Sequence, residues 1–134
     1  MQGANQYQFG TFLLSEPLVS DSFGLSPKSL NQFLDEFGDK REDGTYNKFS
    51  GRRIAACMPM HTFGFIGKIE EITKICNQWN IPVVEDAAEA LGSTYKGQKC
   101  GTFGDFGILS FNGNKIITTS GGGALVCRSK ETKE

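Results

Sequence analysis

The stretch RIAACMPMHTFGFIGKIEEITKICNQWNIPVVEDA, residues 53–87, carries the main evidence for the fold class. It begins with an apolar run that ends at Pro59, which is typical of a buried strand. A turn-rich segment follows, and residues 68–80 then repeat apolar side chains on one side of a helix: Ile69, Ile72, Ile75, Cys76 and Trp79. Residues 81–87 form a second short apolar strand. Strand, loop, helix and strand in this order predict a βαβ unit with parallel strands and a right-handed crossover, and therefore an α/β protein.

The segments on either side of this unit extend the prediction. Residues 26–37 predict a helix, with Ser26 as N-cap, Pro27 at the first helical position and an apolar stripe behind them. The polar residues 38–53 predict a surface loop. Later segments predict a tight turn around Gly97 and two strands, over residues 107–111 and 123–129. Residues 9–19 alternate poorly, which leaves open whether a strand lies there.

Composition restricts the classes of function. A chain of 134 residues fits one domain, and 38% hydrophobic with 22% charged residues indicates a globular protein. The net charge of −1 argues against binding to nucleic acid or to an anionic membrane. The chain contains no apolar run of about 20 residues and no signal-like start, so we expect a cytoplasmic location and no membrane contact. Four scattered cysteines without a CxxC pair predict free buried thiols and no metal site.

Three segments that follow strands contain the candidate functional residues. They carry His61, the acidic residues Glu85, Asp86 and Glu89, and residues 110–115 with Ser110 and Lys115. Ligands of open α/β sheets bind beyond the carboxyl ends of the strands, so these side chains are expected to converge in one crevice.

Lys115 is the candidate nucleophile, because the common phosphate and hydrolase motifs fail. Gly113 leads to Asn114, Lys115 and Ile116, which is not a P-loop, and Ser110 does not lie in GxSxG. A lysine amine can form a Schiff base with an aldehyde such as pyridoxal 5′-phosphate. That cofactor requires a carboxylate at its pyridine nitrogen and donors at its phosphate, which Asp86 and Ser110 could provide. From the pattern alone, a solvated loop lysine remains the alternative.

The segment PVVEDAAEALGSTYKGQKCGTFGDFGILSFNGNKIITTSGGGALV, residues 82–126, resembles the DegT/DnrJ/EryC1/StrS sugar aminotransferase family. MPMHTFGF and SDSFGLSPKSL resemble two earlier family segments. The resemblance implies a three-layer α/β sandwich with a mostly parallel sheet, the fold of the large domain of pyridoxal-phosphate-dependent transferases. It implies that residues 19–134 are part of that domain and that the C-terminal small domain is absent. Residues 1–18 match poorly. Because the family's small domain and part of its large domain are missing, we expect the chain to be a fragment.

The resemblance also implies roles for individual residues. Lys115 matches the lysine that binds pyridoxal 5′-phosphate covalently and moves the proton between cofactor and substrate. Asp86 matches the carboxylate that pairs with the pyridine nitrogen, and Ser110 matches a phosphate-binding hydroxyl. Glu89 stands where the family usually has glutamine or histidine near the phenolic oxygen of the cofactor, and an exposed residue at a helix start is the alternative. For His61 we expect a structural hydrogen bond.

The implied reaction is transfer of an amino group, with glutamate as donor, to a keto sugar linked to a nucleotide. The resemblance implies a homodimer for the full-length parent, while this chain alone is expected to be inactive. One alternative is another pyridoxal-phosphate enzyme of the same fold, such as a lyase or a dehydratase. Related sugar dehydratases carry histidine in place of the lysine, which Lys115 argues against. The other alternative is a non-catalytic α/β interaction module.

Overall fold

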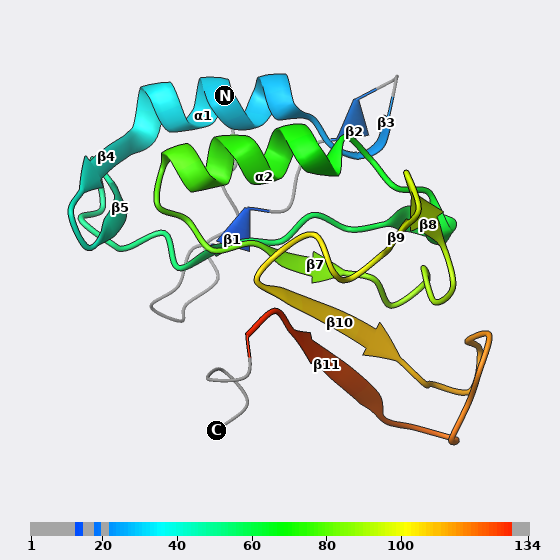
Figure 1. The fold of residues 1–134 in the computed structure, drawn as a ribbon. Coiled ribbons are helices and arrows are strands. Elements are labelled where there is room, and N and C mark those ends of the chain that lie inside the picture. The colour runs from blue at the N-terminus through cyan, green and yellow to red at the C-terminus, as the bar shows by residue number, and fades with distance from the viewer. Residues whose placement is uncertain (1–12, 15–17, 20–21, 130–134) are drawn as a thin grey trace.

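The computed structural model describes residues 13–14, 18–19 and 22–129 (Figure 1). Its helices are α1 (Pro27–Phe37), the short 3-10 helix η1 (Thr62–Gly64) and α2 (Ile69–Gln78). Its strands are β1 (Leu13–Leu14), β2 (Leu18–Val19), β3 (Ser22–Leu25), β4 (Gly38–Arg41), β5 (Gly44–Asn47), β6 (Ala56–Cys57), β7 (Val84–Asp86), β8 (Thr94–Tyr95), β9 (Gln98–Lys99), β10 (Phe106–Ser110) and β11 (Gly123–Cys127).

The predicted βαβ unit is present as β6, α2 and β7. β6 is shorter than the apolar run that predicted it, and isolated parallel bridges, Cys57 with Val83 and Met60 with Asp86, join its strand segment to that of β7. Pro59 lies between the two bridges and has no N–H to donate, which fits the interrupted ladder. The parallel direction of the two segments confirms the prediction made from residues 53–87.

The neighbouring strands form both parallel and antiparallel pairs. β1 pairs with β6 in parallel, and β10 lies between β7 and β11, parallel to β7 and antiparallel to β11. Helices α1 and α2 lie side by side on the same side of these strands (Figure 1). The α/β class is therefore confirmed. Of the three layers expected, the described residues contain the strands and one layer of two helices.

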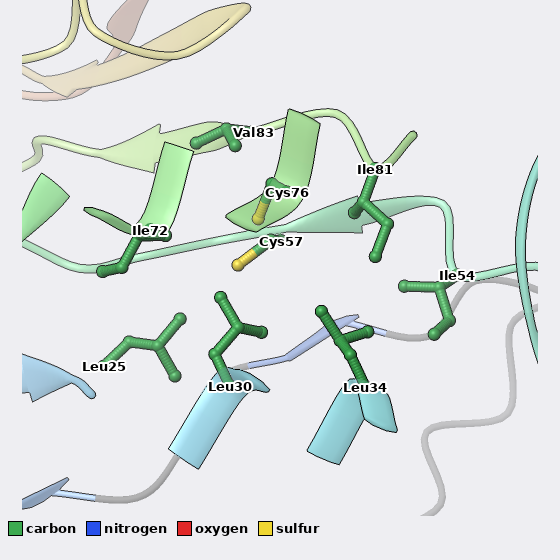
Figure 2. Close-up of a cluster of buried hydrophobic side chains, with 9 residues drawn as sticks. All are labelled: Leu25, Leu30, Leu34, Ile54, Cys57, Ile72, Cys76, Ile81 and Val83. Atoms are coloured by element: carbon green, nitrogen blue, oxygen red, sulfur yellow. The ribbon is translucent and has the colours of Figure 1, made fainter. Parts of the chain in front are cut away.

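The core forms where the two helices meet the strands. Figure 2 shows Leu30 and Leu34 of α1 pointing toward Cys57 on β6 and toward Ile72 and Cys76 on α2. Burying a side chain of the size of Leu34 stabilises the fold by about 1.5–3 kcal/mol. Both helices therefore present to the core the apolar stripes that the sequence predicts.

The N-terminus of α1 also forms as predicted. Ser26 is the N-cap, its hydroxyl accepts a hydrogen bond from the backbone N–H of Ser29 at 3.4 Å, and Pro27 opens the helix. The cap fixes where the chain enters the helix layer.

The predicted surface loop over residues 38–53 is wrong in part, because β4 and β5 form a hairpin there. The polar composition concealed it, since the polar residues Thr45 and Asn47 are buried. The Thr45 hydroxyl donates to the backbone carbonyl of Trp79, and the Asn47 side chain accepts from the N–H groups of Phe49 and Ser50. Polar side chains with hydrogen-bond partners therefore occupy buried positions at which a sequence pattern predicts apolar residues.

The remaining predictions divide between confirmed and untested. β8 and β9 form the tight turn expected around Gly97, and all four cysteines are free, three of them buried. β1 and β2 are strands within residues 9–19. The rest of the segment predicted to match poorly, residues 1–18, lies outside the described residues. Neither described α-helix has the length and apolar character that crossing a membrane would require.

Candidate active site

The carboxyl ends of three strand segments lie next to one another. Asp86 at the end of β7 pairs with Met60 on one side and with Ile108 of β10 on the other. The backbone N–H of His61 donates to the Asp86 carbonyl at 3.0 Å, and the N–H of Ala87 donates to the Ile108 carbonyl at 3.0 Å. The three segments predicted to converge therefore leave the sheet at the same edge.

Lys115 lies in the loop between β10 and β11, and its side chain is turned inward. The loop is closed by a hydrogen bond from the Phe111 N–H to the Gly122 carbonyl, 2.9 Å, and its first turn by one from the Lys115 N–H to the Asn112 carbonyl, 3.0 Å. The Lys115 side chain is 18% exposed, whereas the next residue, Ile116, is 74% exposed. The lysine side chain is therefore largely covered, whereas its apolar neighbour faces solvent.

Glu89 is the partner of the lysine. The Nζ atom of Lys115 lies 3.5 Å from Oε1 of Glu89, and the backbone N–H of Phe63 donates to Oε2 at 2.9 Å. The hydrogen bond from Phe63 is the main cause that lowers the pKa of Glu89. Burial opposes it, and the charge and hydrogen bond of Lys115 add a smaller lowering of the pKa. Glu89 lies in a turn after β7 and not at a helix start. The carboxylate therefore joins the η1 segment to the lysine.

Asp86 and Ser110 end the two strands beside this pair. Both are half-buried. Oδ1 of Asp86 accepts a hydrogen bond from the Ala88 N–H at 3.1 Å, and Oδ2 has no hydrogen-bond partner among the described residues. The Ser110 hydroxyl accepts from the Asn112 N–H at 3.4 Å, which leaves its own hydrogen to donate. The edge thus offers one carboxylate oxygen and one hydroxyl donor.

The expected structural hydrogen bond of His61 is confirmed, and its partner is Glu85. His61 Nε2 lies 2.8 Å from Glu85 Oε2, and the two side chains are 1% and 0% exposed. The same carboxylate accepts from the backbone N–H groups of Gly101, Phe103 and Gly104 at 2.9, 2.5 and 2.7 Å. Burial is the largest single influence and would raise the pKa of Glu85, but the hydrogen bonds from His61, Gly104 and Gly101 together outweigh it and lower the pKa.

Sequence reasoning did not separate Glu85 from its acidic neighbours. One signal was present, because Glu85 follows the buried Val83 by two residues and so shares its face of the strand. An acid in such a position needs several donors, which here come from a turn far along the sequence. Phe63 acts through its backbone N–H, and no sequence pattern indicates this role.

One surface hollow lies away from the ends of these strands. It has a volume of about 580 Å³ and lies between α2 and the hairpin of β8 and β9, and its lining includes Glu70, Gln98 and Arg128. Asp86, Glu89, Ser110 and Lys115 do not line it. The grouping of chemical side chains, and not a cavity, therefore identifies the candidate site.

Comparison with known proteins gives a consistent result. The model of the DegT/DnrJ/EryC1/StrS aminotransferase family matches residues 46–134. The chain is 45% identical over 123 residues, 92% of its length, to a putative pyridoxal phosphate-dependent aminotransferase EpsN from Bacillus subtilis (strain 168). It is 48% identical over 73 residues, 54% of its length, to GDP-perosamine synthase from Caulobacter vibrioides.

A solved structure shows the same fold. The crystal structure of a DegT DnrJ EryC1 StrS aminotransferase from Brucella abortus matches 83% of this chain at 25% identity, with a TM-score of 0.67. The chain spans 28% of the Bacillus protein, 20% of the Caulobacter protein and 28% of the Brucella chain. It therefore corresponds to about a quarter of these proteins.

Proposed function

Because the chain belongs to the DegT/DnrJ/EryC1/StrS aminotransferase family, we propose that it forms part of an enzyme that transfers an amino group to a nucleotide-linked keto sugar. Residues 19–134 belong, in this proposal, to the large domain of that enzyme. The cofactor is pyridoxal 5′-phosphate and the amino donor is glutamate. The name of the Caulobacter relative, GDP-perosamine synthase, supports the substrate class.

The residues at the sheet edge fit this cofactor. Lys115 provides an amine that is largely covered yet held by a single ion pair among the described residues. Asp86 provides an unused carboxylate oxygen that suits a protonated pyridine nitrogen, and Ser110 provides a hydroxyl that suits a phosphate oxygen. The donor set therefore contains the amine, the acid and the hydroxyl that the cofactor requires, which supports the proposal.

In this proposal each residue of the site has a separate role. When bound, pyridoxal 5′-phosphate supplies an aldehyde and an electron sink. Lys115 would hold the cofactor through its amine and would carry a proton on Nζ during the reaction. Asp86 would pair with the protonated pyridine nitrogen, Ser110 would bind the phosphate, and Glu89 would hold the amine of Lys115 near the strand ends. The inward position of Lys115 against Glu89 is the observation that carries this assignment.

The assignment can be tested by chemical trapping. The chain is mixed with pyridoxal 5′-phosphate and reduced with borohydride, and the modified peptide is identified by mass spectrometry. We expect modification of Lys115, its loss in Lys115→Ala, and weaker or nonselective modification in Asp86→Ala. Lys96→Ala is the matched control, because Lys96 is also paired with a glutamate, Glu70, on the exposed surface. Modification scattered over many lysines of a folded sample would contradict the assignment.

The reaction requires a separate test. Product analysis of a longer protein that contains this chain, with glutamate and a nucleotide-linked keto sugar, should show an amino sugar and 2-oxoglutarate. Loss of a hydroxyl group without transfer of nitrogen would instead identify a dehydratase. A protein that binds no cofactor but forms a defined complex would support the interaction module.

We also propose a homodimer for the enzyme. Large apolar side chains are exposed on the two loops beside Lys115: Phe63, Phe65, Ile116 and Ile117. Apolar surface gathered near a polar site often marks an interface. Sedimentation of a longer protein that contains this chain would test the proposal, and a monomer at micromolar concentration would contradict it.

A further inference from the structure

Glu85 is a buried acid that the proposed chemistry does not use. Its two oxygens share four donors: Oε2 faces His61 Nε2 and the Gly101 N–H, and Oε1 faces the N–H groups of Phe103 and Gly104. A carboxylate accepts about four hydrogen bonds, so its capacity is used in full. Because the ionised acid can only accept, Nε2 is the nitrogen of His61 that carries hydrogen.

These bonds connect three segments that lie far apart in the sequence. Glu85 belongs to β7, His61 precedes η1, and residues 101–104 form the turn before β10. Gly107 of β10 packs so closely on the Gly101 carbonyl that a side chain would not fit there. Glu85 therefore fixes the start of η1 relative to the two strands that carry Asp86 and Ser110.

The η1 segment leads directly from this anchor to the lysine. Phe63 lies two residues after His61, and its N–H holds Glu89, which pairs with Lys115. Phe63 has φ 53° and ψ 24°, a left-handed conformation that is unfavourable for a residue with a Cβ atom. Such a conformation persists where the surroundings hold it. The backbone of Gly64 also packs closely on the Glu89 segment, because an added Cβ would lie only 3.1 Å from Ser93 Oγ and 3.2 Å from the Glu89 carbonyl oxygen.

We propose that Glu85 is a positioning residue for Lys115, acting through His61, the backbone N–H of Phe63 and the carboxylate of Glu89. The inference rests on the proposed function, because Lys115, the residue that Glu85 would position, is the proposed nucleophile. The contacts themselves belong to this chain and can be tested without any cofactor.

Glu85→Gln is the sharpest variant, because it keeps the shape of the side chain and removes its charge. The amide nitrogen must face either the N–H groups of Phe103 and Gly104 or the N–H of Gly101 beside His61. In both orientations a donor meets a donor. We expect the His61 anchor to loosen and the η1 segment to move away from Glu89.

The test measures two local properties in the absence of cofactor. The first is hydrogen exchange of the Phe63 amide by NMR, and the second is acetylation of Lys115 by acetic anhydride, quantified by mass spectrometry. In Glu85→Gln we expect both rates to rise severalfold, while exchange at Leu30 and Leu34 in α1 stays unchanged. The matched control is Glu70→Gln, which removes the exposed partner of Lys96 and should change Lys96 alone.

A second variant keeps the proposal falsifiable if Glu85→Gln does not fold. His61→Ala leaves the three backbone donors of Glu85 in place and removes only the imidazole that connects Glu85 to the segment of Phe63. It should raise the same two rates. If a folded variant of either kind leaves the Phe63 and Lys115 rates at their wild-type values, the proposal is wrong. Trapping of pyridoxal 5′-phosphate at another lysine would overturn the proposed function and leave these two readouts unaffected.

Discussion

Two acid–base pairs lie at the same sheet edge and differ in almost every property. His61 and Glu85 are 2.8 Å apart and 1% and 0% exposed, whereas Lys115 and Glu89 are 3.5 Å apart and 18% and 40% exposed. The buried acid is saturated by four donors, while the partly exposed acid holds one N–H and one amine. The His61–Glu85 pair therefore stabilises the structure at the strand ends, whereas the Lys115–Glu89 pair is free to exchange partners.

Solvation explains why the two pairs have different uses. A buried charge is tolerated only when hydrogen bonds replace its water, and removing one partner is then costly. An exposed pair contributes little to stability, because water and salt compete with it. In its proposed role, Lys115 needs a partner that it can leave at little cost. The Glu89 pair meets that requirement and the Glu85 pair does not.

Removal of the buried acid should give the largest effect. In Glu85→Ala the N–H groups of Gly101, Phe103 and Gly104 lose their acceptor, as does His61, so we expect a loss of about 3–5 kcal/mol in the free energy of unfolding. Urea denaturation followed by circular dichroism measures it. Glu70→Ala on the exposed face of α2 is the control, with an expected change within about 0.5 kcal/mol. Equal losses in the two variants would remove the distinction between the pairs.

Acid should weaken the fold through the same carboxyl group. The folded-state pKa of Glu85 lies below its ordinary value of 4.5, so its contribution to stability is fully present above that value. The contribution is lost as the pH falls through the lower, folded-state pKa. Urea midpoints measured from pH 7 to pH 3 should therefore fall more steeply in the wild type than in Glu85→Gln. Parallel curves would show that Glu85 is not the group that titrates.

The fold was predictable where periodicity and burial agree. The apolar stripes of α1 and α2 and the parallel βαβ unit follow from spacing, because the helices and strands bury the faces that the pattern marks. The hairpin of β4 and β5 was not predictable, because its buried side chains are polar and one of them, Thr45, is satisfied by the distant carbonyl of Trp79. Pattern reasoning fails where a tertiary hydrogen bond, and not apolar area, stabilises the structure.

The candidate site likewise contains features that the sequence predicts and features that it does not. The approach of Asp86, Ser110 and Lys115 to one edge follows from the rule for strand ends. The roles of Glu85 and of the Phe63 N–H do not, because they depend on backbone donors whose places are set by the folded chain. Side-chain chemistry can be read from a sequence, whereas backbone hydrogen bonds between distant segments cannot.

The strained link between the two pairs predicts a smaller effect of opposite sign. Phe63 is left-handed and 75% exposed, so Phe63→Gly should relieve the strain while losing little burial, and we expect a gain of about 0.5–1 kcal/mol in stability. Phe65→Gly is the matched control: Phe65 has an ordinary φ of −78°, and glycine there should destabilise. Urea denaturation decides between the signs. A loss of stability in Phe63→Gly would show that the phenyl ring, and not the backbone, holds the segment.

The exposed pair should give the smallest change in stability and a distinct change in chemistry. Glu89→Gln keeps an oxygen for the Phe63 N–H and removes the charge beside Lys115, so the urea midpoint should stay within measurement error of the wild type. Acetylation of Lys115 should nevertheless become faster, because no carboxylate holds the amine. Salt supplies the internal control: about 1 M NaCl reduces the Debye length to about 3 Å, so it should accelerate acetylation of Lys115 in the wild type and have little effect in the variant. A wild-type rate that does not respond to salt would mean that Lys115 is held by packing, and the contrast between the two pairs would then rest on stability alone.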